Sequence, residues 1–325
     1  MKRSLTLLGL SLLLVGLFAC QTGGRGGDPE VRRERLIFAV KGQDSLSLDK
    51  YECATLPDTF VRRPVMLFAF GGGFKGGDKA EPSYIPYFEY LARNGFVVIS
   101  TDYRTLLRHL DPTRVGSPRD FLVVLQQAID ASVEDVYAAT RFVIDRSEEW
   151  RVDTSRVVLS GSSAGAIAVL QAEYYLCNGH PLALDFPVGF NYAGVVAYAG
   201  AIADREAPHW DRKPCPMLLF HGDADRTVPY CQAAIEGLGG LFGSASIAES
   251  LGAASTPYAF YCVSGAGHEI ANLPMSRNLH DIMGFLTRQV LGEQPLVINA
   301  VESAPGDTLP APKVFSVEEY IRANM

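Results

Sequence analysis

The chain has 325 residues, of which 48% are apolar and 20% charged, a composition typical of a globular protein with a full core. The 10% of aromatic residues excludes a wholly disordered chain, and the 31 glycines and 19 prolines follow no fixed period, which excludes a collagen-like repeat. A net charge of −7 argues against a nucleic-acid partner, because sequence-independent binding needs a basic surface.

The N-terminus has the pattern of an export signal. Lys2 and Arg3 precede an apolar stretch, Leu5 to Phe18, which falls short of the roughly 20 residues that a membrane-spanning helix needs. The stretch ends in Leu-Phe-Ala-Cys, which resembles the bacterial lipobox, whose cysteine becomes lipidated. The resemblance implies a lipoprotein signal peptide over residues 1–19 and a lipidated Cys20. A plain secretory signal or a buried helix is the alternative.

A lipidated Cys20 would anchor the exported protein in a bacterial envelope, on its periplasmic or cell-surface face. Residues 20–34 are Gly-rich and are expected to form a flexible tether. The folded domain is expected over residues 35–292, and residues 293–325 are expected to form a C-terminal tail that docks on it through a short amphipathic piece.

The folded part alternates between β-rich runs and helical patterns. The β-rich runs lie at residues 36–40, 46–53, 65–70, 96–100, 157–160, 195–199, 217–220 and 258–263. The helical patterns lie at residues 84–93, 120–144, 164–177, 231–237 with an extension to about 251, and 276–291. This alternation predicts an α/β fold with a mainly parallel sheet and helices on both faces. No helix separates the first two runs, which predicts an antiparallel edge.

The segment Gly161-Ser162-Ser163-Ala164-Gly165 fits the pattern G-x-S-x-G between a β-rich run and a helical pattern. A serine on such a sharp turn needs small neighbours two residues away on either side, and glycines supply them. The sequence therefore predicts Ser163 as a nucleophile. Ser162 is the neighbouring alternative, although Ser160 and Ala164 stand two residues before and after it. The non-functional alternative is a strand-to-helix turn of small residues without a catalytic role.

An acid and a base are expected downstream, in the order Ser, Asp, His. The strand at 217–220 leads into a His-Gly-Asp-Ala-Asp loop, and Asp225 is the predicted acid, with Asp223 as the near rival. His268 follows the strand at 258–263 on a Gly-rich loop and is the predicted base. The remaining histidines precede the serine or the acid, or lie in a helical pattern.

The loop Phe70-Gly71-Gly72-Gly73-Phe74 follows the strand at 65–70 and is predicted to supply an oxyanion hole. Backbone N–H groups there stabilise the negative charge of an acyl-transfer transition state, and glycines let the backbone approach the oxygen closely. Gly72, Gly73 and Ala164 are the expected donors. A flexible loop without this role is the alternative.

Together these motifs resemble the α/β-hydrolase superfamily, specifically the bacterial esterase and lipase group related to hormone-sensitive lipase. The resemblance covers about residues 35–292 and implies a carboxylesterase-like catalytic domain. It departs from the group at Phe70, where the group usually has the histidine of H-G-G-G. Thr101-Asp102-Tyr103-Arg104 matches the group's structural D-Y-R. Only about 24 residues separate Ala199 from Asp223, so no large cap domain is expected, and residues 106–118 and 178–192 are candidates for small rims.

The sequence thus predicts a serine esterase that forms an acyl-enzyme on short-acyl, acetyl or feruloyl esters, either small molecules or carbohydrate-linked. A prolyl-oligopeptidase-like peptidase and a non-catalytic binding protein on the same fold are the alternatives. No cofactor is expected, and no metal site is indicated because no H-E-x-x-H or C-x-x-C spacing occurs. Disulfide pairing stays open for five cysteines: Cys53, Cys177, Cys215, Cys231 and Cys262.

Overall fold

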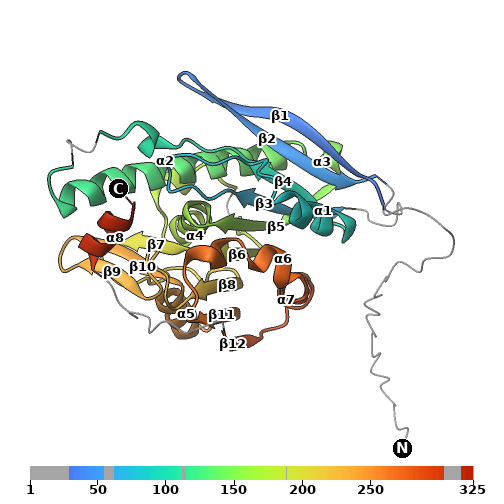
Figure 1. The fold of residues 1–325 in the computed structure, drawn as a ribbon. Coiled ribbons are helices and arrows are strands. Elements are labelled where there is room, and N and C mark those ends of the chain that lie inside the picture. Colours follow the sequence, from blue (N-terminus) through green and yellow to red (C-terminus); the bar gives the residue numbers. More distant parts are fainter. Residues whose placement is uncertain (1–28, 55–61, 112–114, 188, 304–315, 325) are drawn as a thin grey trace, which may run out of the picture.

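The structure is a computed structural model that describes residues 29–54, 62–111, 115–187, 189–303 and 316–324. A nine-stranded sheet runs through the molecule in the order β1-β2-β4-β3-β5-β6-β8-β11-β12 (Figure 1). The predicted signal peptide and Cys20 lie outside the described residues. Within the part that the structure describes, no helix combines the length and the apolar character that crossing a bilayer requires.

The first two strands form the antiparallel edge that the sequence predicts. β1 (Val31–Lys41) pairs with β2 (Asp44–Cys53), and β2 pairs antiparallel with β4 (Val97–Thr101). β1 begins at Val31, so the folded region starts four residues before the expected boundary at residue 35 and takes up the end of the expected tether.

The rest of the large sheet is parallel. It contains β3 (Arg63–Ala69), β5 (Val152–Ser162), β6 (Gly194–Tyr198), β8 (Met217–Gly222), β11 (Tyr258–Ser264) and β12 (Val297–Ser303). From β3 to β8 these strands are buried apart from Arg63 and residues 153–156 at the starts of β3 and β5, because their apolar runs pack helices on both faces. Parallel pairing brings the carboxyl ends of β3, β5, β8 and β11 to one edge of the sheet, where ligands bind in open α/β folds.

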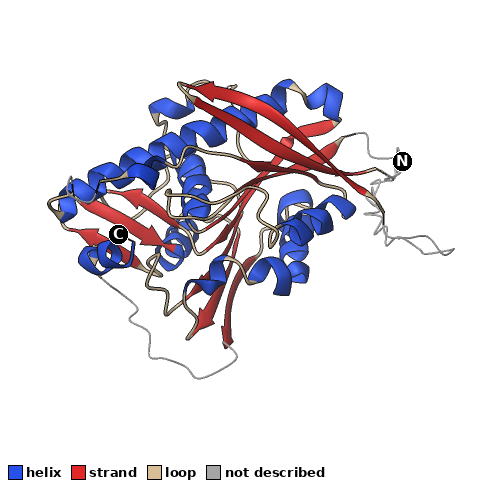
Figure 2. Cartoon of the chain, turned by 45° about the horizontal axis from the view of Figure 1, so that its top comes forward, coloured by secondary structure: helices blue, strands red, loops and turns tan. Residues whose placement is uncertain are grey.

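Helices cover both faces of the sheet (Figure 2). On one side lie α1 (Ile85–Arg93), α6 (Pro274–Arg277) and α7 (Leu279–Phe285), the last continuing as a π-helical turn at Leu286–Leu291. On the other side lie α2 (Pro118–Asp145), α4 (Ala164–Cys177) and α5 (Ser244–Ala253). A short helix, α3 (Ser147–Trp150), leads into β5. Ser117 caps α2 by accepting a hydrogen bond from the Asp120 N–H at 3.2 Å.

A second sheet was not expected from the sequence. It has three antiparallel strands in the order β7-β10-β9, namely β7 (Ala201–Asp204), β9 (Gln232–Ile235) and β10 (Gly239–Gly243). The helix expected at residues 231–237 is therefore wrong, and only its extension contains a helix, α5. β9 and β10 pair closely at Gly240, where a Cβ would lie 2.1 Å from the Ala233 carbonyl oxygen. Glycine at this position allows the pairing that makes residues 232–235 a strand.

The expected C-terminal tail contributes to the domain at two places. β12 pairs in parallel with β11 as the last strand of the large sheet. α8 (Val317–Asn324) buries Val317 and Tyr320, and the Tyr320 ring meets that of Phe121 on α2 with centroids 5.9 Å apart.

Candidate active site

Ser163 lies on the turn between β5 and α4 in a strained backbone conformation, with φ 51° and ψ −120°. Its flanking glycines are required by close contacts. A Cβ at Gly161 would lie 2.4 Å from the Gly165 carbonyl oxygen, and a Cβ at Gly165 would lie 2.2 Å from the Ala69 carbonyl oxygen. The turn thus presses directly against β3, and α4 directs its N-terminal, positive dipole end at the serine.

The structure brings together the three residues expected to form a triad. The Ser163 Oγ is 2.8 Å from the His268 Nε2, and the His268 Nδ1 is 2.7 Å from the Asp225 Oδ2. Asp225 follows β8 and His268 follows β11, so neighbouring strands place both on the carboxyl edge of the sheet. In the arrangement these distances favour, His268 donates its Nδ1–H to Asp225 and accepts the Ser163 O–H at Nε2.

Asp225 is fully buried and held in its charged form. Burial by itself raises the pKa of Asp225, but hydrogen bonds from His221 and His268 outweigh it and hold that pKa well below its usual range. The Thr227 and Val228 N–H groups also donate to its Oδ1, at 2.7 and 3.0 Å. The carboxylate is thereby fixed on both oxygens.

His221 is a site residue that reasoning from the sequence missed. It is completely buried, and its Nε2 lies 3.4 Å from the Asp225 Oδ2 and 3.2 Å from the Val228 carbonyl oxygen. Its Nδ1 lies 2.8 Å from the Ser244 Oγ. The carbonyl needs a donor, so Nε2 carries the proton and Nδ1 accepts from Ser244. The signal was available, because His221 lies near the end of β8, only four positions before Asp225, and the short turn between them keeps the two close.

The two rival residues have other contacts. The Asp223 Oδ1 accepts the Gly265 N–H at 2.7 Å, so Asp223 braces the turn that leads to His268. The Ser162 Oγ contacts the Asn272 Oδ1 at 3.3 Å, and its side chain is buried beside the glycine loop. Neither is placed as Asp225 and Ser163 are.

The glycine loop after β3 runs along the serine turn. Gly72 and Gly73 both have positive φ values, 141° and 61°, and a Cβ at Gly72 would lie 2.2 Å from the Gly76 carbonyl oxygen. A Cβ at Gly71 would touch Ser162 and Ser163, so the loop backbone lies against the predicted nucleophile. Ala164, the residue after Ser163, begins α4.

Phe70, which stands where the resembling group has histidine, is braced by Tyr103. The two rings stack with centroids 4.4 Å apart, and the Tyr103 hydroxyl donates to the Phe70 carbonyl oxygen at 2.7 Å. The neighbouring Arg104 binds Asp135 on α2 at 2.9 Å. These contacts give the D-Y-R segment a structural role, as its resemblance implies.

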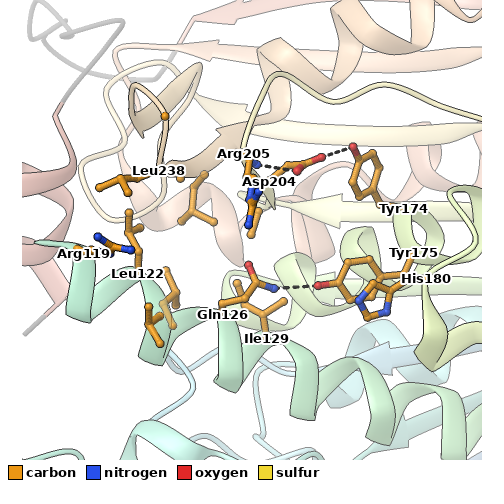
Figure 3. A pocket seen from close by; sticks show the side chains of 16 residues that line it. Arg119, Leu122, Gln126, Ile129, Tyr174, Tyr175, His180, Asp204, Arg205 and Leu238 are labelled. Atoms are coloured by element: carbon orange, nitrogen blue, oxygen red, sulfur yellow. Dashed lines mark hydrogen bonds between the residues drawn. The ribbon is translucent and has the colours of Figure 1, made fainter.

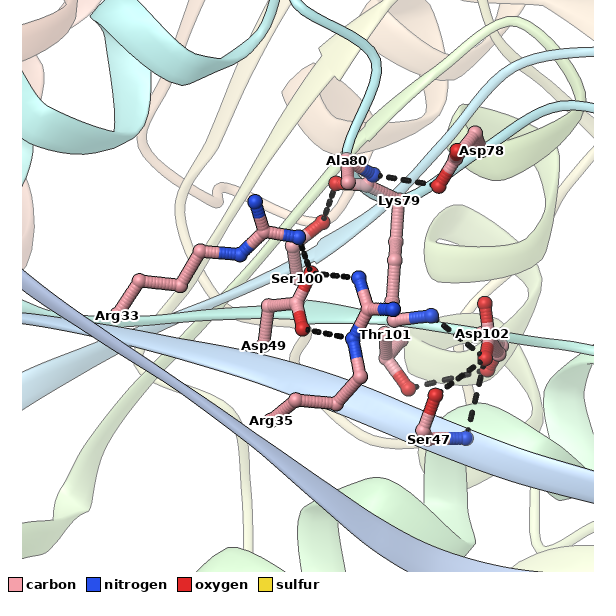
Figure 4. A network of polar contacts seen from close by, with 10 residues as sticks. All are labelled: Arg33, Arg35, Ser47, Asp49, Asp78, Lys79, Ala80, Ser100, Thr101 and Asp102. Carbon is pink, nitrogen blue, oxygen red and sulfur yellow. Dashed lines mark hydrogen bonds and ion pairs between the residues drawn. The ribbon is translucent and has the colours of Figure 1, made fainter.

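A polar network supports the loop from below (Figure 4). Buried Asp49 on β2 binds Arg33 and Arg35 of β1 at 2.6 and 2.7 Å. Asp102 binds the ammonium group of the buried Lys79 at 2.8 Å, and the Ser100 Oγ donates to the Lys79 carbonyl oxygen at 2.7 Å. Lys79 thereby ties the loop that follows the glycines to Ser100 on β4 and to Asp102 just after that strand.

A hollow of about 480 Å³ opens above Ser163 and His268. Apart from the glycines and the predicted catalytic pair, its lining is mostly polar: Lys75, Asp78, Glu81, Tyr84, Ser162, Thr227, Ala271 and Asn272. Among the described residues, none of 106–111, 115–118, 178–187 or 189–192 lines this hollow, where small rims were expected.

Across the described ranges, no cluster of three or more His, Cys, Asp or Glu side chains has the geometry of a metal site. No disulfide joins the five cysteines, all of which lie in described segments. Cys177 and Cys215 instead meet at buried Glu173, whose Oε1 accepts from the Cys177 Sγ at 3.3 Å and from the Cys215 N–H at 2.8 Å.

The fold is that of an α/β-hydrolase, with a mostly parallel sheet, helices on both faces and no large cap domain. The sequence profile of the BD-FAE family matches residues 55–175. Among solved structures, apo esterase 2 of Thermogutta terrifontis covers 80% of this chain and 94% of its own, with a TM-score of 0.56 and 23% identity.

Curated relatives match part of the chain. Esterase B1 of Culex pipiens is 31% identical over 144 residues, which is 44% of this chain and 24% of the mosquito protein. Esterase LipI of Mycobacterium tuberculosis is 30% identical over 128 residues, 39% of this chain and 34% of its own. Lipase 2 of a Moraxella species is 27% identical over 180 residues, covering 49% and 37%. The matches thus span about a quarter to two fifths of these relatives.

Proposed function

We propose that this protein is a serine carboxylic-ester hydrolase in which Ser163, His268 and Asp225 form the catalytic triad. The observation that carries the proposal is the pair of contacts that runs from the Ser163 Oγ through the His268 ring to buried Asp225, at 2.8 and 2.7 Å. The esterase and lipase names of the relatives support the same reaction class.

In the first half-reaction the Ser163 Oγ attacks the ester carbonyl carbon while the His268 Nε2 takes the hydroxyl proton. Asp225 holds the imidazole in the required tautomer and stabilises its cationic form. The carbonyl oxygen becomes negatively charged, and the N–H groups of Gly72, Gly73 and Ala164 are proposed to stabilise it. His268 then returns the proton to the leaving alcohol, and the acyl group stays on Ser163.

In the second half-reaction water attacks the acyl-enzyme. His268 takes a proton from that water, and the same oxyanion donors stabilise the new tetrahedral intermediate. When the Ser163 Oγ leaves, His268 returns the proton to it and the carboxylic acid is released. No cofactor enters this sequence.

The lining of the hollow favours esters with a short acyl group, such as acetyl, or esters of a polar alcohol, such as an acetylated or feruloylated carbohydrate. The Lys75, Asp78 and Glu81 side chains border it, and Ala271 is its one aliphatic side chain among the residues found to line it. A long acyl chain gains about 0.8 kcal/mol per methylene only where apolar surface receives it. Little such surface borders this hollow, while its hydrogen-bonding groups suit hydroxyls.

A series of p-nitrophenyl esters, run beside acetylated and feruloylated xylan, tests this proposal. We expect kcat/KM to be highest between acetyl and about hexanoyl esters and to fall beyond them. A preference for palmitoyl esters would contradict the short-acyl assignment. Efficient cleavage of proline-containing peptides would favour the peptidase alternative, and binding without turnover would favour a non-catalytic protein.

We also propose that the protein is exported and anchored to a bacterial envelope through a lipid on Cys20. The support is the sequence alone, namely the basic residues, the short apolar stretch and the Leu-Phe-Ala-Cys segment at residues 17–20. Several acyl chains on one N-terminus hold a protein stably at a membrane, whereas one chain holds it only marginally.

A further inference from the structure

A second cavity lies on the flank of the domain, away from the hollow at Ser163. It has a volume of about 580 Å³ and is enclosed by α2, the C-terminal half of α4, β7 and β10 (Figure 3). Its walls share no residue with those of the hollow. Its size falls in the range of small-molecule pockets, which is about 300–1,000 Å³.

We call this whole cavity the flank groove. Hydrogen bonds among its lining side chains hold one end of it in place. The Gln126 Nε2 donates to the Tyr175 hydroxyl at 2.8 Å, and that hydroxyl donates to Asp130 at 2.6 Å. His180 stacks on Tyr175, with ring centroids 3.7 Å apart. The Tyr174 hydroxyl donates to Asp204. This end is preorganised, and its one lining carboxylate already has a donor.

The arginines of the flank groove lack such partners. Arg119 at the start of α2 and Arg205 after β7 are exposed, and neither side chain makes a hydrogen bond or an ion pair with any residue that the structure describes. Arg205 points into the groove opposite Gln126 (Figure 3). With two guanidinium groups and one carboxylate, the lining carries a positive charge in a chain whose net charge is −7.

Apolar side chains line the groove at its Arg119 end, where Leu122 and Leu238 lie nearest that arginine (Figure 3). Val123 and Leu238 stand at its mouth with 52% and 40% of their surface exposed, although large apolar side chains in the described regions are mostly buried. Leu125, Ile129 and Leu241 form the buried floor below them. Positive charge and an apolar channel are thus adjacent in one cavity.

We propose that the flank groove binds a single-chain amphiphile whose anionic head is a carboxylate or a phosphate. Guanidinium groups pair with both kinds of anion through charge-assisted hydrogen bonds. The head contacts Arg205, which points into the groove, and the hydrocarbon chain lies along Leu241, Leu238 and Leu122 toward Arg119. This inference does not depend on the proposed esterase activity, because no catalytic group takes part.

Calorimetric titration of the full-length Ser163→Ala protein tests the proposal. The probes are octanoate, octyl phosphate and the uncharged octanamide, below their micellar concentrations, with acetate and inorganic phosphate as head groups alone. We expect one or both amphiphilic anions to bind at least tenfold more tightly than octanamide or a bare head group. The stronger of the octanoate and octyl phosphate arms identifies the head group. Equal binding of octanamide and the anions, or no binding, overturns the proposal.

Two variants locate the binding. Arg119→Gln combined with Arg205→Gln should lower the affinity for the two amphiphilic anions at least tenfold. Leu238→Asp should lower it by a similar factor, because it places a negative charge at the mouth of the groove. Matched controls change exposed residues elsewhere, Arg277→Gln and Leu184→Asp, and should bind as the parent does. Unchanged binding in the groove variants would place the ligand elsewhere, including at the hollow, and would overturn the assignment.

Discussion

The Nε2 of His221 lies 3.4 Å from the same carboxylate oxygen of Asp225 that the His268 Nδ1 contacts at 2.7 Å. The buried Asp225 carboxylate therefore faces two imidazoles. His268 contacts the Ser163 hydroxyl with its other nitrogen, and His221 contacts the Ser244 hydroxyl with its other nitrogen. His221 does not face the hollow. Its part is to position Asp225 and to keep it ionised.

His221→Leu removes this donor and should raise the pKa of Asp225. A depressed pKa in the folded state stabilises the fold above the unfolded value, near 3.8, and that stabilisation disappears as the pH falls. The variant should therefore unfold at a higher pH during acid titration. We also expect kcat to fall about tenfold with KM little changed, since hydrogen bonds to charged groups contribute about 1.5–3 kcal/mol.

His221→Gln is the control for this variant, because its amide N–H can replace the Nε2 donor. It should recover most of kcat and of the acid stability, both measured by ester hydrolysis and circular dichroism. Wild-type kcat and an unchanged acid midpoint in His221→Leu would contradict the positioning role.

Ser163→Ala should abolish ester hydrolysis while the protein stays folded. Removal of a nucleophile lowers turnover by several orders of magnitude. Ser162→Ala is the matched variant and should keep substantial activity, because Ser162 contacts Asn272 and not His268. Turnover of p-nitrophenyl acetate distinguishes them, and an inactive Ser162→Ala beside an active Ser163→Ala would reverse the assignment.

Gly165→Ala should damage both stability and activity. The added Cβ would lie 2.2 Å from the Ala69 carbonyl oxygen, so α4 must move away from β3 and carry Ser163 with it. Overpacking of this kind costs about 1–3 kcal/mol. Gly252→Ala is the control, because its Cβ would meet only ordinary contacts at 3.9 Å on α5. Urea denaturation and kcat/KM measure the two effects, and a fully active Gly165→Ala would show that the close approach is dispensable.

Glu173→Gln should change how stability depends on pH. Burial raises the pKa of Glu173 from 4.5 to about 7, against hydrogen bonds from Cys215 and Cys177. A raised pKa in an acid stabilises the fold below the unfolded value, and this stabilisation is lost as the pH rises toward 7. The wild type should lose on the order of 3 kcal/mol between pH 5 and pH 8 from this group.

Glu173→Gln carries no charge to titrate and should lack that loss. Urea denaturation at the two pH values measures it, with Glu249→Gln on the exposed side of α5 as a control that behaves like the wild type. Equal pH dependence in Glu173→Gln and the wild type would mean that this carboxyl titrates normally.

Cys20→Ala should release the protein from the membrane fraction or block its processing, because the proposed lipid is attached to that thiol. Fractionation and immunoblotting of whole cells measure this, with Cys53→Ala as a control that keeps the thiol at residue 20. Processed, membrane-bound protein in the Cys20→Ala strain would rule out the lipoprotein proposal.

Much of the fold could be predicted because its signals are local. Apolar runs such as Val157–Leu159 predict buried strands, and the glycines around Ser163 predict a sharp turn. β9 was mistaken for a helix, because Ala233-Ala234-Ile235 has no strand pattern until β10 pairs with it. The sequence also does not predict β12, because residues 297–303 become a strand only by pairing with β11, which the chain pattern alone does not reveal. The order of residues along the chain does not indicate a role for His221, although the short loop after β8 brings Asp225 back beside it.

The position of β11 also sets an order in time. β11 carries His268 on the turn after it and pairs with β8 on one side and β12 on the other, and β12 ends at Ser303. Ser163 and His268 lie 105 positions apart in the sequence. A nascent chain that ends before β11 therefore carries the serine turn and the glycine loop without the base. Synthesis from the N-terminus keeps Ser163 unactivated until β11 has been made and has paired with β8.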